Sequence, residues 1–135
     1  MGAVYSIRAY LLYDDEQAVV EAIIKFVKEN TSWVDFNRWD VKKLKKNKTL
    51  MNALRVIFTE HVYKTDPVIR EKYYGYDTDN CYESDFDASY GWESVMTEAF
   101  KYMAPALKDG SELYIWPDSG EDYLVVQNGV SVWVH

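Results

Sequence analysis

The hydrophobic pattern at the start of the chain predicts a strand followed by a helix. Residues 4–12 are rich in β-branched and aromatic side chains, and Ser6 and Arg8 interrupt them at alternate positions, which is typical of a strand with one buried face. Over residues 15–29 apolar pairs recur at helical spacing instead, and the acids at 14–16 suit the positive end of a helix dipole. We therefore expect a strand at 4–12 and a helix at 15–29.

The middle of the chain predicts a second helix. The irregular alternation from Trp33 to Trp39 is compatible with a second strand, and the basic run Lys42 to Lys48 follows it. Thr49 is a good N-cap residue, and the apolar stripe after it extends from Leu50 to Val62. The helix is expected to end at Asp66-Pro67, because the residue before a proline disfavours helical geometry.

The chain then becomes polar, rich in tyrosine and without hydrophobic period as far as about residue 84, which predicts a long loop. A short extended segment is expected over residues 82–89, where alternation separates two sets of side chains. The apolar side is Phe86 and Ala88, and the acidic side is Asp85 and Asp87.

The last third predicts a helix and a β-meander. Ser89 is placed to cap a helix over residues 92–103, which Pro105 kinks or restarts. Asn128-Gly129 is a hairpin dipeptide between the last two of three short strands. These strands are 113–116, 123–127 and 130–134. We expect residues 1–135 to form a single α+β domain, with an antiparallel sheet that includes this three-stranded meander and about three helices on one face.

Composition narrows the functional class. The 135 residues have a formal net charge of −7, are 48% hydrophobic and contain one cysteine, Cys81. A lone cysteine forms no intramolecular disulfide, which favours a reducing compartment, so we expect a cytoplasmic protein. No apolar run is long enough to span a membrane. The negative charge argues against direct, non-specific binding of nucleic acid, because phosphates would be repelled.

The charge is divided unevenly along the chain. Residues 1–64 hold 11 basic and 8 acidic side chains, a net charge of +3, whereas residues 65–135 hold 4 and 14, a net charge of −10. The basic part centres on the run Lys42 to Lys48, which can be a solvated surface or can attract an acidic or phosphate-rich partner.

The acidic part is concentrated in residues 77–87, which contain no lysine or arginine. In an extended segment, side chains two residues apart lie about 6.7 Å apart on one side, comparable to successive phosphates of a nucleic acid. Tyrosines, which are enriched at protein interfaces, interleave with these acids. The candidate partner-binding residues are Asp77, Asp79, Glu83, Asp85, Asp87, Tyr73, Tyr74, Tyr76 and Tyr82.

We find no catalytic signature. The two aspartate-rich stretches that begin like calcium loops lack the required glycine or terminal glutamate. Asp85, Asp87 and Glu93 could form a looser divalent-metal site, and Cys81 with His61 is the one thiol–imidazole pair to consider. We therefore expect neither a catalytic residue nor a resident metal or cofactor.

In its size, acidity and tyrosine content, and in its 77–87 acid run, the chain resembles the small acidic inhibitor proteins of phages and mobile elements, anti-CRISPR and antirestriction proteins among them. The resemblance implies a non-enzymatic protein that inhibits a basic, nucleic-acid-handling partner, such as a host-defence nuclease, by occupying its phosphate-binding surface. Two alternatives stay open: a small metal-assisted enzyme built on Asp85, Asp87 and Glu93, and an immunity protein that neutralises a nuclease toxin.

Overall fold

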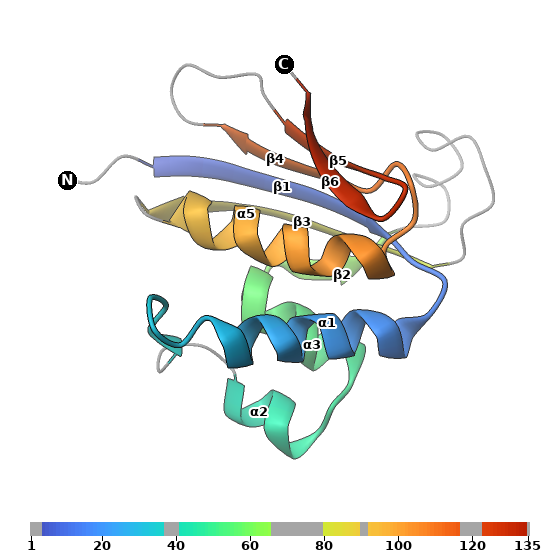
Figure 1. Ribbon diagram of the computed structural model, residues 1–135. Helices are drawn as coiled ribbons and strands as arrows, with labels where there is room; N and C mark the ends of the chain where they lie inside the picture. The colour runs from blue at the N-terminus through green and yellow to red at the C-terminus, as the bar shows by residue number, and fades with distance from the viewer. Residues whose placement is uncertain (1–3, 37–40, 66–79, 90–91, 117–122, 135) are drawn as a thin grey trace.

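The protein is built on one six-stranded antiparallel sheet (Figure 1). The computed structural model describes residues 4–36, 41–65, 80–89, 92–116 and 123–134. Across the sheet the strand order is β2-β3-β1-β4-β5-β6. The strands are β1 (Val4–Leu12), β2 (Val62–Lys64), β3 (Cys81–Ser89), β4 (Glu112–Trp116), β5 (Tyr123–Gln127) and β6 (Val130–Val134). The predicted α+β class and the C-terminal meander are therefore confirmed.

Four α-helices lie on one side of this sheet among the described residues, where about three were expected (Figure 1). They are α1 (Glu16–Glu29), α2 (Val41–Lys46), α3 (Leu50–Phe58) and α5 (Trp92–Met103), and the 3-10 helix η2 (Ala104–Ala106) follows α5. The helix α5 packs on the sheet and on α1, α1 packs on α3, and α2 packs on α3 farthest from the sheet. No helix of the described residues is long and apolar enough to cross a membrane.

Local sequence determines where several elements begin and turn. The side chains of Asp15 and Thr49 cap α1 and α3, because each accepts a hydrogen bond from a backbone N–H of the first helical turn. Between β5 and β6, Asn128 and Gly129 have φ angles of 54° and 76°. Both angles belong to the left-handed region that a two-residue hairpin turn requires, and Asn and Gly tolerate it best.

Alternation along the strands separates a buried face from a polar one. Ile7, Ala9 and Leu11 of β1 are fully buried under the helices, and β4 and β5 contribute alternate residues to the same core. Those residues include Leu113 and Ile115 of β4 and Leu124 and Val126 of β5. The residues between them, one position along, face away from the helices.

Two expectations for the middle of the chain are wrong. Of the span 33–39, residues 33–36 form a turn and a short irregular stretch rather than a strand, and residues 37–39 lie outside the described residues. The helix α3 ends at Phe58 and not at Asp66-Pro67. Thr59, with φ of 58°, turns the chain, and Val62–Lys64 pairs with β3 as strand β2. At Val62, pairing with a strand distant in sequence therefore outweighs the apolar residues at helical spacing that predicted a longer helix.

Two boundaries near β3 also differ from expectation. The loop predicted to reach residue 84 gives way to β3 at Cys81, because residues 81–84 are paired with β1 and residues 82–84 also with β2. Residues 66–79 of that predicted loop lie outside the described residues. Ser89 is the last residue of β3 and not the cap of α5, which begins at Trp92.

Candidate functional site

The face of the sheet turned away from the helices carries acids and tyrosines in registered rows. One row crosses all six strands in the order Tyr63, Glu83, Tyr10, Glu112, Val125 and Val132. The next row runs through Asp85, Arg8, Tyr114, Tyr123 and Val134, and Asp87 pairs with Ser6 in a third. We define the acidic face as Ser6, Arg8, Tyr10, Tyr63, Glu83, Asp85, Asp87, Glu112, Tyr114 and Tyr123.

Negative charge dominates this face. Its residues include four carboxylates and one guanidinium, Arg8, which gives them a net charge of −3. Arg8 forms an ion pair with Asp85 at 3.4 Å, and the two side chains remain 40% and 55% exposed. Ser6 donates a hydrogen bond of 3.1 Å from its hydroxyl to Asp87. The exposed ion pair between Arg8 and Asp85 is solvated and therefore weak. The carboxylates of Asp85 and Asp87 remain accessible to a partner.

Glu83 lies in the middle of the acidic face, between Tyr63 and Tyr10. Burial raises the pKa of Tyr63, and the negative charge of Glu83 and its hydrogen bond with Tyr63 raise that pKa further. The Oε2 atom of Glu83 is shielded from solvent and has no hydrogen-bond partner within the described part of the chain. A carboxylate oxygen in such a position is stabilised by any cationic donor that reaches it.

The tyrosines of β1, β4 and β5 pack on one another beside these acids. The ring centroids of Tyr114 and Tyr123 are 4.7 Å apart in a stacked arrangement, and Tyr10 meets Tyr114 edge-on at 6.4 Å. The Tyr114 hydroxyl donates a hydrogen bond to the Glu112 carboxylate. Burial, followed by this hydrogen bond, raises the pKa of Tyr114 above its ordinary value. The aromatic cluster is therefore held in place before any partner binds.

The structure brings together only some of the predicted partner-binding residues. Glu83, Asp85 and Asp87 alternate along β3 and lie on the acidic face, as an extended segment requires. Tyr82 does not join them, because it lies on the opposite face, against the core, and stacks on Tyr13 with centroids 6.0 Å apart. The remaining candidates lie outside the described residues: Asp77, Asp79, Tyr73, Tyr74 and Tyr76.

Sequence reasoning missed seven of the ten residues of the acidic face. Tyr10, Tyr63, Tyr114, Tyr123 and Glu112 come from strands far from the 77–87 run, so no local charge count finds them. Alternation did contain the signal, since each of Tyr10, Tyr114 and Tyr123 is next to residues of the core-facing set. What the sequence could not provide was the order of the strands, which places β3 beside β1 and β1 beside β4.

The metal-site alternative is not supported. Asp85 and Asp87 lie on the acidic face, whereas Glu93 belongs to the first turn of α5 on the helical side of the sheet. The described residues contain no group of three or more His, Cys, Asp or Glu side chains that could hold a metal ion. The pattern Asp85, Asp87 and Glu93 is close in sequence but divided between the two sides of the sheet.

The thiol–imidazole pair does not form either. Cys81 is fully buried at one end of β3, where its sulfur accepts a hydrogen bond of 3.1 Å from the Thr65 hydroxyl. The exposed ring of His61 stacks on Phe86, on the other face of β3 and five residues along it. A buried thiol on one face and an imidazole on the other cannot act as nucleophile and base.

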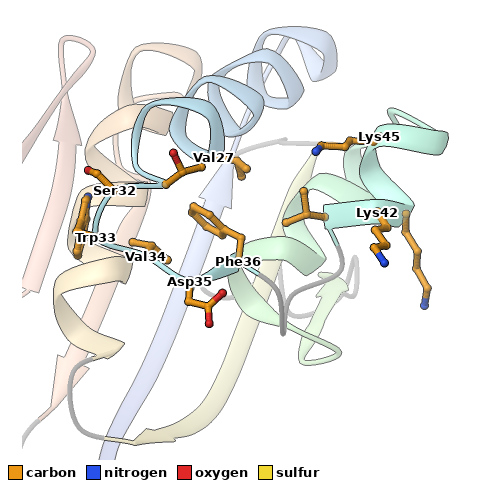
Figure 2. Close-up of a pocket in the computed structure, with 11 residues that line it drawn as sticks. Val27, Ser32, Trp33, Val34, Asp35, Phe36, Lys42 and Lys45 are labelled. Carbon is orange, nitrogen blue, oxygen red and sulfur yellow. The ribbon is translucent and has the colours of Figure 1, made fainter.

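A second feature is a groove between the C-terminal end of α1 and α2 (Figure 2). Two adjoining cavities, of about 790 Å³ and about 390 Å³, share Val27, Thr31, Val41 and Lys45 as lining residues. The rim carries five lysines from the basic run and from α1. We name this feature the lysine groove, and its lysines are Lys28, Lys42, Lys43, Lys45 and Lys48.

Comparison with known proteins adds no relative. No protein-family profile, curated protein or solved structure matches this chain. The function must therefore be inferred from the geometry of the acidic face and the lysine groove.

Proposed function

We propose that the protein is a non-enzymatic inhibitor whose acidic face binds a basic, nucleic-acid-handling partner and occupies that partner's phosphate-binding surface. The observation that carries the proposal is the placement of Glu83, Asp85 and Asp87 on one exposed sheet face with a preassembled tyrosine cluster. A cleft that binds phosphates presents lysine and arginine side chains, which can also pair with a row of carboxylates.

The spacing of the acids supports this form of recognition. Alternate residues of β3 place their carboxylates about 6.7 Å apart along the strand. Because β3 pairs with β1 along its whole length and with β2 at residues 82–84, the row is ordered in the free protein. Binding then costs little backbone entropy, and fast association under electrostatic attraction is expected.

The tyrosines and valines beside the acids indicate what the rest of the partner's surface should contain. Tyr10, Tyr114 and Tyr123 lie on β1, β4 and β5, and the exposed Val132 lies on the same face of the neighbouring strand β6. Aromatic side chains at the centre of an interface contribute large contact areas at low entropic cost. The partner is therefore expected to present an apolar patch next to its lysines and arginines.

The proposal is tested with a charge-neutralised variant, Glu83→Gln/Asp85→Asn/Asp87→Asn. Partners are captured from a lysate of the source cells on wild-type protein and identified, and the affinity of each for both proteins is measured. We expect the variant to lose about 100-fold or more in affinity, because several charged contacts disappear together. The matched control Glu21→Gln/Glu60→Gln/Glu98→Gln changes the net charge equally on the helical side and should bind within about twofold of wild type.

Two results would contradict the proposal. One is a partner affinity that the variant retains although its unfolding transition is normal. The other is an equal loss in the matched control, which would mean that net charge and not the acidic face governs binding.

A further inference from the structure

The lysine groove has an apolar floor that is fixed by contacts within the protein. Phe36 packs edge-on against Phe26 with ring centroids 5.8 Å apart, and Val34 N–H donates to the Asn30 carbonyl at 3.0 Å. At the groove's end, the Trp33 indole N–H donates to the buried Asn30 side chain at 2.6 Å, so a ring that is 49% exposed is held in one position. Such a floor is ready to accept apolar side chains without rearranging.

The charge around this floor is strongly positive. The lining residues of the two cavities include five lysines and one carboxylate, Asp35. None of the five lysines forms an ion pair in the part of the chain that the structure describes. In Figure 2, Lys42 and Lys45 lie on the α2 side of the groove, across from Val27 at the end of α1. Unpaired ammonium groups beside an apolar surface favour a ligand that is both anionic and apolar.

We propose that the lysine groove binds an acidic peptide segment of a partner protein, with apolar side chains on the floor and carboxylates against the lysines. The two adjoining cavities share four lining residues and together form one continuous groove beside α2, which suits an extended or helical segment rather than a compact small molecule. This site is independent of the proposed function, because it is formed by different elements and selects the opposite charge.

A single selection experiment tests the groove. A displayed library of random twelve-residue peptides is selected on the intact protein, and the enriched peptides are synthesised and titrated against variants. We expect one enriched group to combine Asp or Glu with Leu, Ile or Phe. Lys42→Glu/Lys45→Glu should weaken this group about tenfold or more. The control Lys46→Glu/Lys101→Glu makes the same charge change outside the groove. Lys46 belongs to α2 and Lys101 to α5, and neither lines a cavity. The control should bind the peptides within about twofold of the wild-type affinity.

The same peptides separate this proposal from the one above. The variant Glu83→Gln/Asp85→Asn/Asp87→Asn should bind the enriched acidic peptides as tightly as wild type does. If that variant still bound a basic partner with full affinity, the result would count against the acidic-face proposal and not against the groove proposal. A selection that enriches no acidic and apolar group would overturn the groove proposal. The groove proposal would also be overturned if the Lys42→Glu/Lys45→Glu variant folded like wild type and bound the enriched peptides as tightly as the control variant does.

Discussion

The two faces of the sheet are made by alternate residues of the same strands, yet they differ in what they contribute. On β1, Ile7, Ala9 and Leu11 are sealed under the helices, while Arg8 and Tyr10 between them remain partly exposed on the acidic face. The covered face removes apolar surface from water, which stabilises the fold. The exposed ion pair of the acidic face adds little to stability. The face is nevertheless ordered by that packing, so its charges are fixed in register.

A second contrast concerns charge rather than burial. The acidic face belongs to the sheet, and the lysine groove lies near α2, the helix farthest from the sheet (Figure 1). The net charge of −7 therefore hides two surfaces of opposite sign on different elements. Separation of this kind lets one small domain engage two partners, or two regions of one partner, without the surfaces neutralising each other.

The largest expected effect is a difference in unfolding free energy between substitutions at two neighbouring residues that lie on opposite faces of the sheet. Ile7→Ala should lower the free energy of unfolding by about 2–5 kcal/mol, because it leaves a cavity in the fully buried core. Arg8→Ala should change it by about 1 kcal/mol or less, because its ion pair with Asp85 is exposed. Urea unfolding of both variants measures the difference. Equal losses would mean that the acidic face is part of the stabilising core after all.

Alkaline pH should also destabilise the protein through the covered face. Burial raises the pKa of Tyr13 to about 12, so its unfolded form ionises near pH 10 while the folded form stays protonated. The stability that this difference provides is complete below about pH 10 and is lost as the pH rises through about 12. The Tyr13→Phe variant cannot ionise at this position and should lose less stability over that interval. Urea midpoints from pH 8 to 12 test this, and parallel decline of both proteins would refute it.

The smallest effect has an informative sign. Arg8 is the one cation among the residues of the acidic face, so Arg8→Gln should make the face more negative. We expect the affinity for a basic partner to rise by about two- to fivefold and to become more sensitive to salt. Titrations at two salt concentrations measure both changes. A loss of affinity would show that Arg8 contacts an acidic group of the partner.

Most of the fold could be predicted from the sequence where local signals agree. The alternation of β1, the cap at Thr49 and the Asn128-Gly129 hairpin each specify their element by short-range chemistry. Prediction was wrong where long-range pairing decides, as at Val62–Lys64, which continues a helical stripe but forms β2 on β3. Nothing local to that segment identifies its distant partner strand.

The candidate site was predictable in the same limited way. The alternation that separates Asp85 and Asp87 from Phe86 is visible in the sequence, and the structure keeps it. Tyr82, however, was assigned by proximity in sequence, although the alternation of β3 directs it to the core. Glu112 joins the acidic face only because β4 pairs with β1, which depends on the fold of the whole domain.

The most direct test of the central claim is competition for the captured partner between this protein and an oligonucleotide. We predict that increasing concentrations of the oligonucleotide displace the protein, that the two never bind the partner together, and that Glu83→Gln/Asp85→Asn/Asp87→Asn no longer competes. A stable ternary complex of partner, oligonucleotide and this protein would contradict the account, because the acidic face would then bind somewhere other than the phosphate-binding surface.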